Sequence, residues 1–109
     1  MHKKLGIGLI GVGHLGKIHL RLILENPYLH LVGIYDHNDE LARKIEADFG
    51  VRRYENADQL IQDSEALDIV TPTLSHFDYA SRAIRASRHI FIEKPLTHTV
   101  KEGKKLVDL

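Results

Sequence analysis

The sequence predicts an α/β fold, a doubly wound parallel sheet with helices on both faces and therefore three layers. Apolar segments of strand length alternate five times with amphipathic segments of helix length along the 109 residues. This alternation is typical of parallel strands joined by right-handed helical crossovers. A glycine-rich turn, residues 11–16, joins the first strand to the first helix. We expect one domain over residues 1–109, with the strand order 3-2-1-4-5.

The first strand is expected over residues 5–11, where apolar side chains are interleaved with two glycines. A helix follows over residues 15–25, because apolar residues recur at helical spacing and Asn26-Pro27 ends the segment. The apolar stripe expected to face the sheet comprises Leu15, Ile18, Leu22 and Leu24. The opposite face carries charged side chains and is expected to face solvent.

The other elements follow in the same alternation. Residues 30–36 are mostly apolar, as expected of a strand that is buried on both faces. Asn38 or Asp39 can cap the next helix, and Gly50 can end it. The remaining helices are expected at residues 39–49, 57–62 (from residue 56 or 57), 76–87 and 97–106. The remaining strands are expected at residues 51–54, 66–71 and 89–93, the first of them a short edge strand.

Composition argues against several classes of function. The 43% hydrophobic and 28% charged fractions are ordinary for a globular domain, and the formal net charge is zero. A neutral chain gives no reason to expect nucleic acid or an anionic membrane as partner. The absence of cysteine excludes disulfides and thiolate chemistry, and the eight histidines are too scattered to predict a metal site. No apolar run is long enough to span a membrane, so we expect a cytoplasmic protein.

The functional prediction begins with the run Gly11-Val12-Gly13-His14-Leu15-Gly16. A strand, a G-x-G-x-x-G turn and a helix together hold the pyrophosphate of a dinucleotide at the helix N-terminus. Gly11 permits the tight turn, Gly13 lets the backbone approach the phosphates, and Gly16 lets the helix pack against the strand. Alone the motif is a weak signal, since glycines in such a turn can serve packing only.

Asp36 strengthens this interpretation. It lies 20 residues beyond Gly16, at the expected end of the second strand, where an acidic side chain accepts hydrogen bonds from the adenosine ribose. A carboxylate there also repels a 2′-phosphate, and the next residues, His37 and Asn38, supply no arginine. We therefore expect NAD(H) rather than NADP(H), a preference that the arginines at 52–53 could weaken by folding back. The alternative is a carboxylate that serves only a turn or a helix cap.

Two further segments follow the fourth and fifth expected strands, Thr71-Pro72-Thr73-Leu74-Ser75-His76 and Glu93-Lys94-Pro95-Leu96. Ligands of open α/β sheets bind beyond the carboxyl ends of the strands. With the glycine run, His19 and Asp36, these segments resemble the glucose–fructose oxidoreductase, inositol dehydrogenase and rhizopine-catabolism (Gfo/Idh/MocA) family. The resemblance covers essentially all 109 residues and implies the family's N-terminal nucleotide-binding domain, a Rossmann-type fold.

The resemblance also implies roles for individual residues. Those that would line the pyrophosphate are Gly11, Val12, Gly13, His14, Leu15 and Gly16. Those that would lie at the adenosine ribose are Asp36 and His37. Those that would lie beside the nicotinamide half of the cofactor are Thr71, Pro72, Thr73 and His76. Those that would lie near the nicotinamide ribose and the substrate are Glu93, Lys94 and Pro95, with Lys94 as the catalytic or substrate-orienting lysine.

Several of these residues also have simpler interpretations. An ammonium such as that of Lys94 would stabilise developing alkoxide character on a substrate hydroxyl, with Glu93 orienting it or holding a ribose hydroxyl. The alternative is an inert lysine at a strand–loop junction. His76 could equally orient the helix that follows or touch a ligand. His19 is expected to pack beneath the phosphate loop as a hydrogen-bonded histidine.

The resemblance limits what this chain is expected to do alone. Members of the family continue with a sixth strand and a C-terminal domain that covers the nicotinamide and contacts the substrate, and neither is present in this sequence. We expect the NAD(P)-binding part of an oxidoreductase that transfers hydride to or from a sugar, polyol or related hydroxy or carbonyl compound. Without the second domain it would be catalytically incomplete, and homo-oligomers are possible. The alternative is a standalone dinucleotide-binding or sensing module without chemistry, which could dimerise through an exposed sheet edge.

Overall fold

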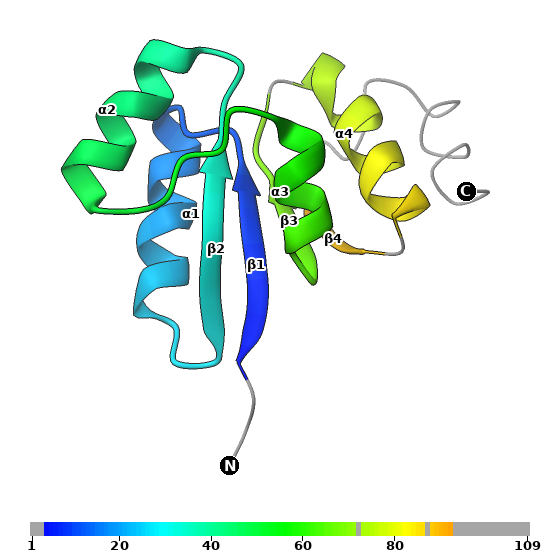
Figure 1. Cartoon of the computed structure of the whole chain (residues 1–109), viewed down its shortest axis with the longest axis horizontal. Helices are drawn as coiled ribbons and strands as arrows, with labels where there is room; N and C mark the ends of the chain where they lie inside the picture. Colours follow the sequence, from blue (N-terminus) through cyan, green and yellow to red (C-terminus); the bar gives the residue numbers. More distant parts are fainter. Residues whose placement is uncertain (1–3, 72, 87, 93–109) are drawn as a thin grey trace.

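The computed structural model describes residues 4–71, 73–86 and 88–92, with side chains for residues 4–71, 78–86 and 88–90. A parallel sheet lies at the centre, with helices on both faces (Figure 1). The strands are β1 (Leu5–Ile10), β2 (Leu29–Tyr35), β3 (Ala66–Ile69) and β4 (His89–Ile92). The helices are α1 (His14–Glu25), α2 (Asp39–Phe49), α3 (Ala57–Asp63) and α4 (Thr73–Arg85). None of these four helices is long and apolar enough to cross a membrane.

The four strands are ordered β2-β1-β3-β4, and all pairs are parallel. This order agrees with the prediction except at one edge, where the strand expected over residues 51–54 is a single bridge between Ile34 and Arg53. The backbone N–H of Arg53 donates to a carboxylate oxygen of Glu46, at 3.2 Å. The bridge itself consists of the bonds from the N–H of Ile34 to the carbonyl of Arg52 and from the N–H of Tyr54 to the carbonyl of Ile34, so the N–H of Arg53 is the donor that faces away from β2, and Glu46 covers it at the sheet edge.

One apolar core lies on each face of the sheet. The core between the sheet and helices α1 and α2 contains the buried residues Ile7, Leu9, Val12, Leu20, Ile23, Ile34, Ile45 and Ala66. The core between the sheet and helices α3 and α4 contains the buried residues Ile10, Tyr54, Leu60, Ile61, Leu67, Ile69, Ala80 and Ala83. Side chains alternate between the faces of a strand, so Leu9 and Ile10 of β1 lie in different cores. The three predicted layers are therefore present.

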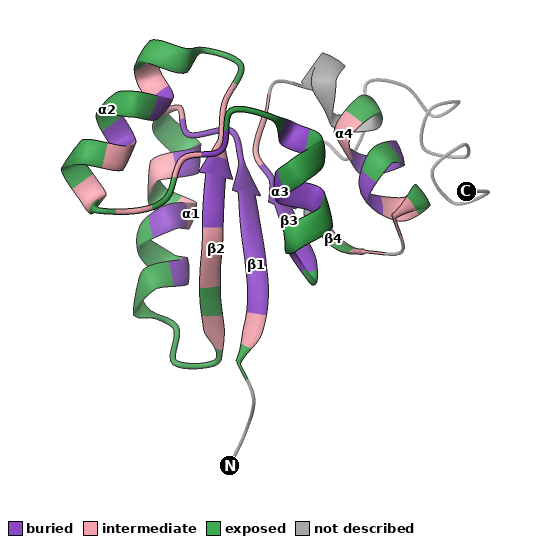
Figure 2. Ribbon diagram, viewed as in Figure 1, coloured by how far each residue is buried: buried purple, intermediate pink, exposed green. Residues whose placement is uncertain are grey.

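The apolar stripe predicted for α1 is wrong. The four residues that were expected to face the sheet are 40–61% exposed, and they are Leu15, Ile18, Leu22 and Leu24. The buried residues of α1 are instead Gly16, Leu20 and Ile23 (Figure 2). The reason is the contact at Gly16, where an added Cβ would overlap the carbonyl oxygen of Gly11. That close approach fixes the rotation of α1 about its axis. As a result, the apolar stripe that was expected to face the sheet is directed to solvent instead.

The fourth helix also differs from the prediction, because α4 begins at Thr73 rather than at residue 76. Thr73 therefore belongs to the first turn of the helix and not to the preceding loop, whereas His76 lies in the helix as predicted. Pro72, Glu93, Lys94 and Pro95 lie outside the described residues, as does the helix expected over residues 97–106.

Candidate cofactor-binding site

The turn between β1 and α1 requires glycine at two positions. Gly11 has a φ of +100°, and a Cβ there would lie 2.7 Å from the backbone carbonyl of Val70. Gly16 lies against the carbonyl oxygen of Gly11, as described above. A side chain at either position would collide with backbone, which cannot move aside. The predicted roles of these glycines, a tight turn and close helix packing, agree with this geometry.

Gly13 serves a different purpose. A Cβ at this position would meet nothing within 4 Å, so its lack of a side chain is not needed for packing. Gly13 is the N-cap of α1, no side chain of the described residues caps this end, and the first turn holds no acidic residue. The N–H groups of the first turn and the positive end of the helix dipole therefore face open space. Such an end binds anions, and phosphate groups in particular.

Asp36 connects the glycine turn to the end of β2. One carboxylate oxygen accepts the N–H of Val12 at 2.9 Å, and the other accepts the N–H of Asn38 at 2.9 Å. The carboxylate therefore does serve a turn at Asn38, which was the simpler interpretation. It also anchors the glycine turn, residues 11–16, through the N–H of Val12. Its side chain is 10% exposed, and each oxygen can accept a further hydrogen bond. The exposed ring of His37 lies beside it, with Nδ1 3.5 Å from Oδ1.

A cavity of about 400 Å³ lies between these elements. Its lining residues come from the glycine turn, the β2–α2 junction and the end of β3, and they are Gly11, Gly13, His14, Leu15, Gly16, Asp36, His37, Asn38, Leu41, Val70 and Thr71. The Thr71 hydroxyl oxygen is buried and has no hydrogen-bond partner among the described residues. The wall thus offers N–H groups at the start of α1 and a carboxylate, which fits a ligand with both phosphate and sugar hydroxyl groups.

Most of the predicted site residues with described side chains line this cavity. Val12 is the exception, because its side chain is fully buried in the core and only its N–H is directed to the site, through Asp36. The prediction missed three lining residues. Asn38 and Val70 are next to residues that were predicted, but Leu41 carried no signal beyond its position one turn into α2.

Asp68 is another residue that sequence reasoning missed. It lies on β3, is 7% exposed, and places Oδ2 2.8 Å from Nδ1 of His19 on α1. The prediction that His19 is a hydrogen-bonded histidine is confirmed. A carboxylate inside an otherwise apolar strand was the available signal, since such a group needs a partner. This hydrogen bond therefore links α1 to β3.

A second and larger hollow, about 580 Å³, lies along residues 52–62. Its wall includes the start of α3, but the side chain of Asn56 already accepts the N–H groups of Asp58 and Gln59 there. A guanidinium nitrogen of Arg53 in the same wall lies 3.5 Å from the carboxylate of Glu55. Because these groups are already used within the protein, the cavity at the glycine turn, called the glycine cavity below, is the stronger candidate for a ligand site.

Comparison with known proteins identifies the family of this chain. The sequence model of the GFO_IDH_MocA family, described as "Oxidoreductase family, NAD-binding Rossmann fold", matches residues 5–109. UDP-N-acetylglucosamine 3-dehydrogenase of Acidithiobacillus ferrooxidans is 37% identical over 102 residues, which are 94% of this chain and 32% of that protein. The NAD(+)-dependent scyllo-inositol 2-dehydrogenase of Bacillus subtilis is 31% identical over 108 residues, covering 95% of this chain and 32% of that protein.

A solved structure of the Acidithiobacillus enzyme matches this fold with a TM-score of 0.89 and 36% sequence identity. The match covers 96% of this chain and 34% of that one. The chain thus spans about a third of the length of the curated relatives it matches. It belongs to the Gfo/Idh/MocA family of oxidoreductases and corresponds to the family's N-terminal, NAD-binding Rossmann domain.

Proposed function

We propose that this NAD-binding domain serves an oxidoreductase that transfers hydride between the nicotinamide and a sugar, a polyol or a related hydroxy or carbonyl compound. The observation that supports it most is the uncapped start of α1, which opens onto a cavity with Asp36 in its wall. The relatives described above supply the substrate class, since their names are those of a nucleotide-sugar dehydrogenase and an inositol dehydrogenase.

The cofactor is proposed to lie along the cavity in one direction. Its pyrophosphate meets the N–H groups that follow Gly13, and its adenosine ribose donates hydroxyl protons to Asp36. Asp36 favours NAD over NADP, because a carboxylate at the ribose repels a 2′-phosphate. The nicotinamide half extends past Thr71, whose buried hydroxyl has no other partner among the described residues.

The chemistry is proposed to rest on the segments after β3 and β4. Pro72, Thr73 and His76 flank the nicotinamide, and Glu93, Lys94 and Pro95 adjoin its ribose and the substrate. For a substrate hydroxyl to become a carbonyl, its O–H proton would pass to a base in the part of the enzyme that contacts the substrate, which gives the oxygen alkoxide character, and the electron pair of the adjacent C–H bond would pass as hydride to the nicotinamide. The Lys94 ammonium stabilises that charge, and Glu93 orients the lysine or holds a ribose hydroxyl.

We expect the groups that contact the substrate to lie in a part of the enzyme that corresponds to the other two thirds of the relatives' length. Hydride transfer requires the substrate to be held against the nicotinamide with water excluded. A nucleotide-binding domain supplies only one side of such a site. A cytoplasmic location and self-association through a sheet edge stay predictions.

Calorimetric titration with NAD⁺ tests the cofactor assignment, and micromolar binding is expected. To test the activity, this chain would replace the corresponding domain of the Acidithiobacillus dehydrogenase, whose fold it matches over 34% of that chain. The chimera should reduce NAD⁺ with that enzyme's substrate, and Lys94→Ala should abolish turnover while leaving NAD⁺ binding intact. A folded chimera that binds NAD⁺ but transfers no hydride would instead favour a binding or sensing module.

A further inference from the structure

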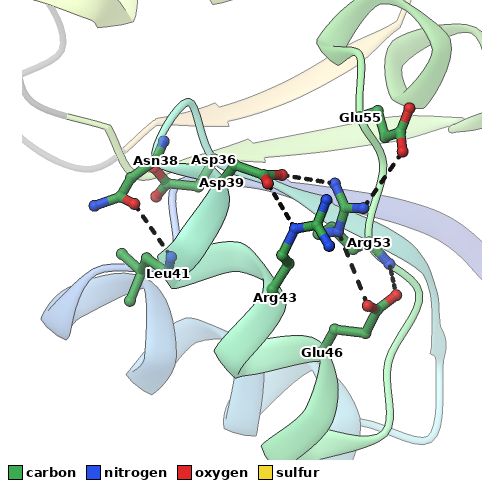
Figure 3. Close-up of polar contacts among 8 residues, drawn as sticks. All are labelled: Asp36, Asn38, Asp39, Leu41, Arg43, Glu46, Arg53 and Glu55. Atoms are coloured by element: carbon green, nitrogen blue, oxygen red, sulfur yellow. Dashed lines mark hydrogen bonds and ion pairs between the residues drawn. The ribbon is translucent and has the colours of Figure 1, made fainter.

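Two arginines meet at one carboxylate beside the proposed ribose site (Figure 3). Asp39 accepts a hydrogen bond from Nε of Arg43 at 2.6 Å and another from Nη1 of Arg53 at 2.9 Å. Arg53 also has nitrogens 3.5 Å from Glu55 and 3.9 Å from Glu46. Three carboxylates therefore surround two guanidinium groups, and Asp39 is the one they share.

The shared carboxylate of this cluster directly follows the residues that line the proposed adenosine ribose site, Asp36, His37 and Asn38. Asp39 is the first residue of α2 and lies three positions after Asp36. Asn38, between them, donates its N–H to Asp36 and accepts the N–H of Leu41. The side chain of Arg43 points back along α2 towards its first turn, as long helical side chains do. Both guanidinium groups are thus held at Asp39 in the first turn of α2, next to Asn38 of the cavity wall, although neither arginine lines the cavity itself.

Arginine is the side chain best suited to bind a phosphate, because its planar donors match two phosphate oxygens. NADP differs from NAD by a phosphate on the 2′-oxygen of the adenosine ribose, which is the oxygen next to Asp36 in the proposed pose. The arginines at 52–53 were the groups expected to weaken a preference for NAD by folding back. Arg53 does fold back onto α2, but carboxylates hold it, and its side chain is only 11% exposed.

The hydrogen bond from Arg43 lowers the pKa of Asp39 below its ordinary value, and the charges of Arg43 and Arg53 act in the same direction. Asp39 is therefore ionised at neutral pH and keeps both arginines paired. A 2′-phosphate that entered this corner would have to displace Asp39 from them while lying next to the carboxylate of Asp36.

We propose that Asp39 is a second determinant of cofactor selectivity, which withholds Arg43 and Arg53 from the 2′-phosphate of NADP. Asp36 attracts the ribose hydroxyls of NAD, and Asp39 prevents the nearby cations from attracting the phosphate of NADP. The inference rests on the proposed function, because it takes the adenosine ribose to lie at Asp36.

The test is calorimetric titration of the whole chain and its variants with NAD⁺ and NADP⁺. Asp39→Asn keeps the shape of the side chain and removes its charge. It should raise the affinity for NADP⁺ about tenfold, the scale of one charge-assisted contact, and change the affinity for NAD⁺ less than about twofold. The matched control is Glu40→Gln, which removes one charge from the same exposed turn of α2. Within the described chain Glu40 has no ion pair with either arginine, so the control should leave NADP⁺ binding nearly unchanged.

Removing the arginines completes the test. Arg43→Gln and Arg53→Gln should not alter NADP⁺ affinity in the wild type, but in the Asp39→Asn background they should abolish the gain. Normal NAD⁺ binding with no gain in Asp39→Asn beyond that of Glu40→Gln would overturn this inference alone. A gain that persists without either arginine would overturn it too. A wild type that binds no NAD⁺ would overturn the proposed function and this inference with it.

Discussion

The first turns of α1 and α2 begin beside the same cavity, yet their N-termini are built in opposite ways. At α2, the side chain of Asn38 accepts the N–H of Leu41, and two acidic residues, Asp39 and Glu40, lie in the first turn. At α1, the cap residue is Gly13, no side chain in the described part of the chain accepts a first-turn N–H, and the first turn contains no acid. Helix starts share one requirement, acceptors for their free N–H groups and negative charge near the positive end of the dipole.

The difference shows how this protein makes a binding site. Helix α2 meets the requirement with its own side chains and gains stability, whereas α1 leaves it for a ligand to meet. The two ends are joined by Asp36, whose two carboxylate oxygens accept the N–H of Val12 before α1 and of Asn38 before α2. Through Asp36, the capped N-terminus of α2 and the uncapped N-terminus of α1 are therefore linked to each other.

The largest expected effect separates the two kinds of glycine at the open end. Gly16→Ala should lower the free energy of unfolding by about 3 kcal/mol or more, because its Cβ would overlap the backbone of Gly11. Gly13→Ala, whose Cβ would meet nothing within 4 Å, should cost less than about 1 kcal/mol. Urea denaturation of both variants measures this, and equal losses would show that the closeness of α1 to the turn is not what requires Gly16.

The next effect comes from giving α1 the kind of cap that α2 has. Gly13 has φ −67° and ψ −160°, an extended conformation open to any residue. Gly13→Asp should therefore keep or raise stability, by up to about 1 kcal/mol, while lowering NAD⁺ affinity at least about tenfold through charge repulsion and loss of free N–H groups.

Gly13→Asn is the matched control for that charge, since it fills the cap without an ionised group. It should lose less affinity than Gly13→Asp when both are titrated with NAD⁺. Undiminished binding by the aspartate variant would mean that the pyrophosphate does not lie at this helix end.

A smaller effect is expected at a self-capped end away from the glycine cavity. Asn56 caps α3 by accepting the N–H groups of Asp58 and Gln59 at 2.8 and 3.2 Å. Asn56→Ala should cost about 1 kcal/mol of stability with no change in NAD⁺ affinity. Thermal denaturation and titration of the same sample would separate the two properties, and a loss of affinity would place the ligand near α3.

The smallest expected effect is a pH dependence at the far end of α3. The hydroxyl of Tyr54 donates to Asp63 at 2.7 Å, and this bond, then one from Gln59, lowers the pKa of Asp63 below its ordinary value of 3.8. A lowered folded-state pKa contributes stability that is present above the unfolded value and is lost as the pH falls below it. Tyr54→Phe should therefore destabilise the protein at neutral pH, and by less at about pH 3. Denaturation at both pH values measures this, and an equal or larger deficit in acid would contradict it.

The sequence predicted most of the fold because strand and helix periodicities alternate without interruption. The rotation of α1 could not be read in the same way. Its sequence has apolar residues on two faces, and the contact between Gly16 and the carbonyl of Gly11, made only in the folded turn, decides which face is buried. Likewise, the edge strand expected at residues 51–54 pairs with β2 only through the bridge between Ile34 and Arg53, and the residue pattern did not indicate how short this pairing is.

The candidate site was predictable where residue type and spacing carry the chemistry, as at Gly13 and Asp36. It was not predictable where lining depends on which elements become neighbours. Val70 reaches the cavity because β1 pairs with β3, which brings the end of β3 against Gly11. In the sequence, Asp39 resembled an ordinary acidic residue in the first turn of a helix. Its hydrogen bond with Arg53 forms only because the bridge to β2 brings residue 53 close to α2.

Amide chemical-shift mapping by NMR during a titration with NAD⁺ tests the central claim most directly. If the uncapped start of α1 binds the pyrophosphate, the largest shifts should fall on the amides of Gly13, His14 and Leu15. The self-capped amides of Asp58 and Gln59 at α3 should stay unchanged. Saturable shifts that cluster instead along residues 52–62, with the glycine turn unaffected, would contradict the account.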